Sequence, residues 1–158
     1  MYTQQLQKTK ENRRMWTLDK SLGFLTTRTA RSMKRALDAK LADYGLTATQ
    51  YIVLVRLWEE DGIPLTQLGE PLYLDNPTIT GIIDRMERDG LLERRRDGDD
   101  RRVVNVYLTE KGRGFRGKVG KLGEETDAEA WKGFSESQKN ELLDQLNRIW
   151  KKMNEGLI

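Results

Sequence analysis

The chain contains no cysteine and no histidine among its 158 residues. Without cysteine there can be no disulfide, no thiolate zinc site and no thiol that senses oxidation. Without histidine the chain lacks the commonest general base and the commonest transition-metal ligand. It also carries no glycine-rich phosphate loop, no nucleophile elbow and no calcium-loop spacing of carboxylates. We therefore predict that the chain is not an enzyme and needs no metal or other cofactor.

Long hydrophobic runs are missing as well. No stretch approaches the roughly 20 apolar residues that a membrane span needs, and the first residues show no apolar core of a signal peptide. Only 37% of the residues are hydrophobic whereas 34% are charged, which favours a helical protein with large exposed faces. We expect one domain, or one domain with extensions, in the cytoplasm and without a membrane partner.

The net charge of +3 gives weak support for a polyanionic partner, so the distribution of charge is more informative. Basic residues gather in three groups, but acidic residues lie among them, and a solvated surface of mixed charge is the alternative. The groups are Arg28, Arg31, Lys34, Arg35 and Lys40; Arg94 to Arg96 with Arg101 and Arg102; and Lys111, Arg113, Arg116, Lys118 and Lys121.

The most informative segment runs from residue 91 to residue 109. Apolar and other residues alternate with a period of two from Val103 to Leu108, and Asp97-Gly98 has the composition of a hairpin turn. The pattern predicts two short strands joined by an acidic turn with arginines on both sides. Guanidinium groups at the tip of such a ribbon suit the narrow, negative minor groove of DNA. The alternative is a solvated hairpin whose arginines pair with the acidic residues of the turn.

Helical periodicity dominates the stretch before the hairpin. Apolar residues recur at helical spacing from Leu22 to Leu41, and Gly45 is a natural stop, which predicts a long first helix. A second helix is expected to open within Leu46 to Gln50 and to end at Glu59 to Gly62. A third, short helix is expected to be capped by Thr66, although a glycine and a proline weaken its interior. It carries Leu68, Leu72 and Tyr73.

The fourth helix gives the sharper signal. Asp75-Asn76 offers an N-cap, Pro77 fits the first helical position, and an apolar face from Ile79 to Met86 leads to Gly90. Small hydroxyl residues near the start of a helix can approach a phosphate or a base edge closely, as a recognition helix does, or can simply cap the first turn. The third and fourth helices, followed directly by the arginine-flanked hairpin, predict a winged helix-turn-helix.

Two more helices are expected after the hairpin. Ser135 to Gln138 forms a capping-box pattern for the last one. Apolar residues then follow at helical spacing, and the N-terminal leader supplies more of them. They are Leu142, Leu143, Leu146, Ile149, Trp150 and Met153, with Leu6, Met15 and Trp16 in the leader. Such stripes suit a dimer interface, but they equally suit a helix that packs on its own chain.

Several runs resemble the MarR (multiple antibiotic resistance regulator) transcription factors. Asp100-Arg101-Arg102, then a strand, then Leu108 to Gly112 is similar to the wing signature of that family, and Thr80 to Arg94 resembles its recognition helix and exit. The similarity extends from Leu22 to the C-terminus and is most specific from Leu46 to Gly112. It implies a mainly α fold with a small β-hairpin wing and about six helices. The implied parts are 1–45, a leader and first dimerisation helix; 46–112, the winged helix-turn-helix; and 113–158, the C-terminal dimerisation helices.

The resemblance also implies roles for single residues. Arg102 matches the wing arginine placed at the minor groove, and Asp100 matches the carboxylate that braces it, two positions away on one face of a strand. Thr78, Thr80 and Arg85 match contacts to phosphates and bases, and Thr66 matches a phosphate contact. Gly81 departs from relatives with a long side chain there, so the operator sequence is not predictable. The remaining expected DNA-binding residues are Asn76, Pro77, Arg94, Arg95, Arg96 and Arg101.

The resemblance further implies a homodimer on a pseudo-palindromic double-stranded operator, usually as a repressor, with half-sites about 34 Å apart. Relatives often hold phenols or aromatic carboxylates in a cleft walled by helices one, two and five, and such a ligand would release the DNA. Here Arg31, Tyr51, Val55 and Trp58 are the candidate lining. The plainer interpretation makes the aromatic residues core and Arg31 a surface charge.

Two other classes of function stay open at this point. A winged helix can be a protein-protein interaction module without specific DNA readout, in which case Arg102 would be dispensable. An enzyme would need a carboxylate pair in a cleft, such as Glu59 and Asp61, but these residues are typical of a helix end.

Overall fold

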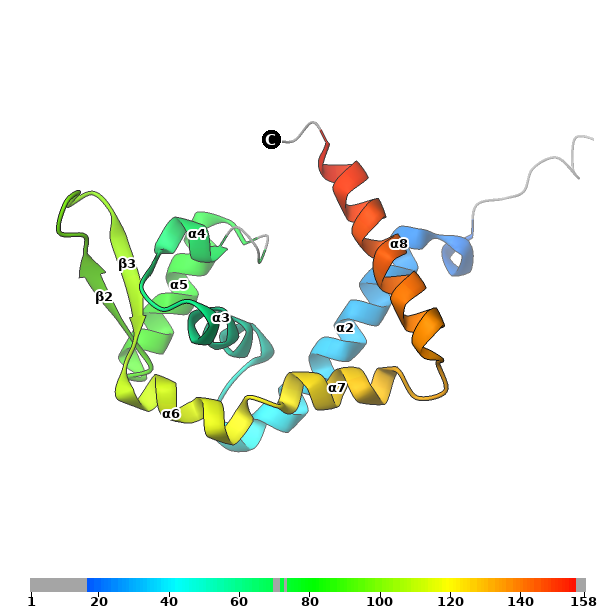
Figure 1. Ribbon diagram of the computed structural model, residues 1–158, viewed down its shortest axis with the longest axis horizontal. Coiled ribbons are helices and arrows are strands. Elements are labelled where there is room, and N and C mark those ends of the chain that lie inside the picture. The colour runs from blue at the N-terminus through cyan, green and yellow to red at the C-terminus, as the bar shows by residue number, and fades with distance from the viewer. Residues whose placement is uncertain (1–16, 70–71, 73, 156–158) are drawn as a thin grey trace, which may run out of the picture.

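The computed structural model describes residues 17–69, 72 and 74–155 (Figure 1). Helices dominate it, and a small sheet projects at one end of the molecule, opposite the C-terminal helix α8. The helices are η1 (Leu18–Lys20), α2 (Leu22–Leu41), η2 (Ala42–Tyr44), α3 (Ala48–Glu59), α4 (Leu65–Gly69), α5 (Asn76–Arg88), α6 (Glu110–Val119), α7 (Leu122–Ala130) and α8 (Glu136–Asn154). The strands are β1 (Ile63–Pro64), β2 (Leu92–Arg96) and β3 (Val104–Leu108).

Side-chain caps start several of the helices, and α3 begins within the predicted opening from Leu46 to Gln50. Thr47 and Gln50 form a reciprocal capping box at α3, and Ser135 and Gln138 form another at α8. Each box satisfies backbone N–H groups that have no partner inside the helix. Asp75 caps α5 by accepting a hydrogen bond from the backbone N–H of Thr78 at 2.7 Å. The mainly α fold with a hairpin wing is therefore confirmed, and these ends of its helices are locally encoded.

Two predicted helix starts need correction. Thr66 does not cap the third helix, because α4 begins one residue earlier, at Leu65. In α5 the N-cap is Asp75 alone, so Asn76 takes the first helical position and Pro77 the second. A proline in the first turn costs no hydrogen bond, since the N–H groups there have no helical acceptor. Of the other expectations, Tyr73 and the leader residues Leu6, Met15 and Trp16 lie outside the described residues.

The sheet has the strand order β1-β3-β2, with antiparallel pairing throughout. Strands β2 and β3 pair from Leu92 opposite Leu108 to Arg96 opposite Val104, as the alternating pattern predicts. Strand β1 was not predicted, because its two residues are too short to show a period of two. It pairs Ile63 with Val106 and thereby ties the end of α3 to the base of the wing.

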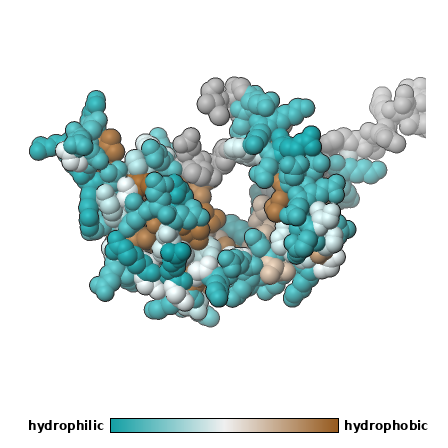
Figure 2. All heavy atoms as spheres, viewed as in Figure 1, coloured by the Kyte–Doolittle hydropathy of each residue, from teal (hydrophilic) through white to brown (hydrophobic). Residues whose placement is uncertain are grey.

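The buried core lies among α3, α4, α5 and the sheet. Fully buried side chains come from each of these elements, and two come from the neighbouring ends of α2 and α6. They are Leu41, Val53, Leu54, Leu57, Leu68, Ile79, Ile83, Met86, Leu92, Val106 and Val119. We call this unit, residues 41–119, the lobe; the proposed boundaries 1–45, 46–112 and 113–158 stay a prediction. Figure 2 shows hydrophobic atoms gathered over the lobe and a smaller group beside α8.

Outside the lobe, α2 packs along α7, and Lys40 pairs with Glu129 at 3.0 Å. The expected fifth helix consists of α6 and α7, separated only by Gly120 and Lys121. No residue of α8 is buried. Among the residues described here, no helix combines the length and the apolar character needed to cross a membrane.

Candidate nucleic-acid interface

The loop between β2 and β3 is organised by Asp97. Its carboxylate accepts hydrogen bonds from the backbone N–H groups of Asp99 at 2.9 Å and Asp100 at 3.1 Å, and from the Asn105 amide at 3.1 Å. These bonds, led by the one from Asp100, lower the pKa of Asp97 below its usual value. The predicted turn residue therefore holds the tip of the wing in one conformation through its charged form.

Arg102 leaves this loop with its side chain 90% exposed. Its Nε and Nη2 donate to the two oxygens of Asp100 at 3.0 and 2.9 Å, a bidentate pair. The pair lowers the pKa of Asp100 and raises that of Arg102, so both groups stay charged. The predicted brace exists, but both residues lie in the turn before β3 and not on a strand. The result is an oriented guanidinium that faces solvent.

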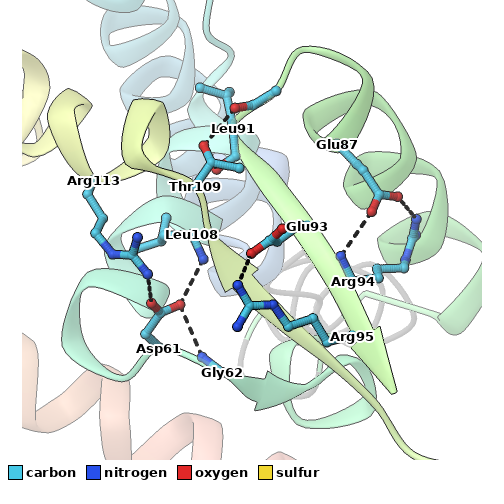
Figure 3. A network of polar contacts seen from close by, with 11 residues as sticks. Asp61, Gly62, Glu87, Leu91, Glu93, Arg94, Arg95, Leu108, Thr109 and Arg113 are labelled. Carbon is cyan, nitrogen blue, oxygen red and sulfur yellow. Dashed lines mark hydrogen bonds and ion pairs between the residues drawn. The ribbon is translucent and has the colours of Figure 1, made fainter. Parts of the chain in front are cut away.

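Arg94 points inward, unlike Arg102. Its guanidinium contacts Glu87 at 2.6 Å and Asp84 at 2.7 Å, and it donates to the Thr80 carbonyl at 3.3 Å. Its backbone N–H also donates to Glu87 at 2.9 Å, and its side chain is only 22% exposed (Figure 3). Arg94 therefore braces β2 against α5, a role that the sequence interpretation did not give it, and its predicted contact with DNA stays a prediction. The signal available was Asp84 and Glu87, two carboxylates on one side of the predicted helix.

The other wing arginines differ in their exposure and in their ion pairs. Arg95 forms an ion pair with Glu93 (Figure 3), and its guanidinium lies over the ring of Tyr107, 4.6 Å from the centroid. Arg96 and Arg101 are exposed and form no ion pair within the described part of the chain. Together with Arg102 they make the loop end of the wing basic.

The exposed face of α5 carries the other expected contacts. Ile79, Ile82, Ile83 and Met86 point into the core, which leaves Asn76, Pro77, Thr78 and Arg85 exposed and Thr80 half-buried. Thr66 is exposed on α4. The structure thus leaves all of these side chains except Thr80 open to solvent.

Asp61, which the sequence placed at a helix end, has a long-range structural role that sequence reasoning missed. It accepts hydrogen bonds from the backbone N–H groups of Gly62 at 3.1 Å and Leu108 at 2.8 Å, and it pairs with Arg113 at 2.8 Å (Figure 3). These contacts fasten the end of α3 to the end of β3 and to α6. Gly62 beside it has a φ of +77° and the ring of Tyr107 against it, so no side chain fits there. Asp61 therefore holds the base of the wing against α3 and α6.

The four candidate effector residues do not come together. Tyr51, Val55 and Trp58 line a cavity of about 550 Å³ between α3 and the α6–α7 junction. Arg31 lies elsewhere, beside a smaller cleft on α2 of about 240 Å³. The cations at the larger cavity are instead Arg116 and Lys121, which sequence reasoning did not select because the bend in the helix brings them there.

Two of the aromatic residues also have structural hydrogen bonds. The Tyr51 hydroxyl donates to the Gly120 carbonyl at 3.0 Å and accepts from the Gly123 N–H at 3.1 Å. The Trp58 indole donates to the Gly112 carbonyl at 3.1 Å. Trp58 therefore attaches α3 to α6, and Tyr51 attaches α3 to the α6–α7 junction, where the cavity opens.

The helices α4 and α5, followed by the β2–β3 hairpin, define a winged helix-turn-helix protein, and comparisons with known proteins agree. Residues 46–104 match the model of the MarR family. The chain is 42% identical over 103 residues to the HTH-type transcriptional regulator TtmR of Methylorubrum extorquens, covering 65% of this chain and 53% of that protein. The aligned segments span 53% to 65% of the first curated relatives.

Solved structures extend the similarity over most of the chain. A probable transcriptional regulator from Pseudomonas aeruginosa is 32% identical with a TM-score of 0.76, over 84% of this chain and 99% of that one. A putative MarR family regulator from Listeria monocytogenes, complexed with 26mer DNA, is 26% identical with a TM-score of 0.80, over 86% and 91%. The chain belongs to the MarR family.

Proposed function

We propose that the chain is a sequence-specific double-stranded DNA-binding transcriptional regulator that acts as a homodimer, as a repressor. The observation that carries the proposal is Arg102, a fully charged guanidinium held bidentately by Asp100 and 90% exposed at the end of the wing. Such a group loses little conformational freedom on entering a minor groove, because its orientation is already set. The Listeria relative was solved in complex with 26mer DNA, which supports DNA binding by a chain of this fold.

A second copy of the chain is the proposed partner of the exposed apolar side chains at the two ends of the chain. Leu143 is 48% exposed and Leu146 39% exposed on α8, and Leu18 and Leu22 are about half exposed near the N-terminus. Covering these side chains in a dimer would remove apolar surface from water. Two wings and two copies of α5 would then address the two halves of a pseudo-palindromic operator, and the double attachment would add avidity.

A small phenolic or aromatic carboxylate effector is the proposed regulator of DNA binding. The cavity beside Tyr51 offers aromatic walls for a ring, and Arg116 and Lys121 offer charge for an anion. Because the cavity lies where Tyr51 attaches the lobe to the α6–α7 junction, a ligand there would favour a different spacing of the two wings. A coupling of about 1 to 3 kcal/mol is enough to release an operator.

The test is a fluorescence-anisotropy titration of a duplex from the promoter beside the chain's own coding region. We expect Arg102→Ala to weaken binding by roughly tenfold and to reduce the slope of log affinity against log salt by about one. Lys132→Ala, which removes one exposed charge from the turn after α7, serves as the matched control. Equal, weak binding of promoter and random DNA by wild type and Arg102→Ala would contradict the proposal and favour a protein-protein interaction module.

A further inference from the structure

A second cleft, which we call the α3–α5 cleft, lies beside the N-terminal half of α5. It has a volume of about 430 Å³ and is walled by three elements. Lys34 comes from α2, Thr47 and Thr49 come from the start of α3, and Thr78 and Arg85 come from α5. These residues are spread over about a third of the chain, from Lys34 to Arg85, so only the tertiary fold brings two cations and three hydroxyl groups to one depression.

Arg85 is the first cation of the cleft. A Cβ atom added at Gly81 would lie 3.9 Å from Nη1 of Arg85, so the guanidinium reaches back along α5 to a turn where the absence of a side chain leaves room. The nearby carboxylates of α5, Asp84 and Glu87, are both held by Arg94. Arg85 itself forms no ion pair within the described ranges, and its donors remain available.

Lys34 is the second cation, and it is held in place by Asp38 at 2.6 Å. The other oxygen of Asp38 accepts the backbone N–H of Ala48 at 2.6 Å, which ties α2 to the start of α3. The hydrogen bond from Lys34 is the main cause of a lowered pKa at Asp38. An ammonium group has three donors, so Lys34 keeps two beyond Asp38. Two carboxylates adjoin the cleft, Asp38 on Lys34 and Asp75 on the backbone N–H of Thr78, so the free donors of Lys34 and Arg85 are what the cleft offers to an anion.

We propose that the α3–α5 cleft binds a phosphate of the DNA backbone, with Arg85 and Lys34 as its cationic ligands. The inference rests on the proposed DNA-binding function. A guanidinium fork and an ammonium group match an oxyanion that accepts several hydrogen bonds, and the surrounding threonines are polar enough to keep it hydrated. The cleft adjoins the helix expected in the major groove, so a strand flanking that groove passes over it. The proposed DNA interface thereby gains three residues from outside the helix-turn-helix: Lys34, Thr47 and Thr49.

The first arm of the test is the salt dependence of operator binding. We expect Lys34→Gln to reduce the slope of log affinity against log salt by about one and to weaken specific and random duplexes by the same factor, roughly threefold to tenfold. Arg35→Gln is the matched control, since it removes the adjacent charge of α2 from a different cleft. Equal melting temperatures establish that the variants fold. A Lys34→Gln slope equal to that of the control overturns the inference while leaving the proposed function intact.

The second arm locates the phosphate. Operator duplexes carry a neutral methylphosphonate at one backbone position at a time. We expect one position in each half-site to weaken wild type and to have no further effect on Lys34→Gln, because the contact is already lost. If the loss of affinity caused by each methylphosphonate adds fully to the loss caused by Lys34→Gln at every position, the inference is overturned. Failure of wild type to bind any duplex overturns both proposals.

A third arm separates DNA from free phosphate, since the cleft chemistry suits either source. Inorganic phosphate is titrated into wild type and Lys34→Gln while the amide resonances of Thr49 and Thr78 are followed by NMR. Shifts that saturate at low millimolar phosphate in wild type only, combined with no methylphosphonate effect, mean that the cleft holds a free anion. That outcome overturns the assignment to the DNA backbone.

Discussion

Helices α5 and α8 carry the same kind of sequence signal and end in opposite environments. Both are amphipathic and both start at a side-chain cap. The apolar face of α5 is buried, with Ile83 and Met86 fully inaccessible, whereas no residue of α8 is buried. Periodicity therefore reports that a helix has an apolar face, but it does not report what covers that face. In the lobe the cover comes from the same chain, whereas for α8 the proposed cover is a second copy of the chain.

The largest expected effect is on the lobe core. Leu54→Ala should lower the free energy of unfolding by about 2 to 5 kcal/mol, because Leu54 is fully buried and its loss leaves a cavity. Leu143→Ala, the matched change on α8, should cost less than about 1 kcal/mol in dilute protein and more as concentration rises. Urea unfolding followed by circular dichroism measures both. Equal losses of unfolding free energy for the two variants in dilute protein would show that α8 is covered within its own chain, so that α5 and α8 would not differ.

A charge introduced on α8 should weaken self-association without changing the stability of the lobe. We expect Leu146→Asp to weaken self-association by roughly a hundredfold or more, since burying an unpaired carboxylate costs several kcal/mol. Asn140→Asp places the same residue on another face of α8 and is the control. Sedimentation equilibrium gives the association constants, and circular dichroism checks that the lobe melts unchanged. Unchanged association of Leu146→Asp would mean that this face does not lie in an interface.

A smaller effect is expected where the two regions are joined. Tyr51→Phe leaves the Gly120 carbonyl and the Gly123 N–H without their hydroxyl partner, at a cost of about 1 to 2 kcal/mol. Hydrogen exchange of the Gly123 amide should accelerate, while amides of the lobe core keep their protection. Tyr44→Phe, at an exposed tyrosine, should leave exchange unaltered. Uniform acceleration across the lobe would argue that Tyr51 acts as core and not as a local tie.

The smallest effect is a pH dependence confined to the wing. Folding lowers the pKa of Asp97, so its contribution to stability is present above the unfolded value of about 4 and is lost as pH falls through the lower folded value. We expect the amide resonances of the loop to lose their dispersion on acidification in wild type and to be insensitive to it in Asp97→Asn. Gly98→Ala keeps the carboxylate and should behave as wild type. Loss of dispersion in Asp97→Asn with the same midpoint would exclude Asp97 as the titrating group.

Local chemistry accounts for what was predictable. The capping boxes at Thr47 and Ser135, the N-cap at Asp75 and the alternation from Val103 to Leu108 each involve neighbours within a few residues, so their signals are complete in the sequence. Strand β1 was not predictable because its two residues have meaning only opposite Val106, far along the chain.

The sequence by itself determined where most helices begin, that a hairpin with an acidic turn follows the fourth of them, and that Arg102 has Asp100 within reach. Only the tertiary structure decided that Arg94 faces inward to Asp84 and Glu87, that Arg31 lies away from Tyr51, and that Asp61 fastens the wing. The physical reason is range. Caps, turns and strand alternation depend on residues a few positions apart, whereas the partner of a long charged side chain depends on which elements the hydrophobic core brings together.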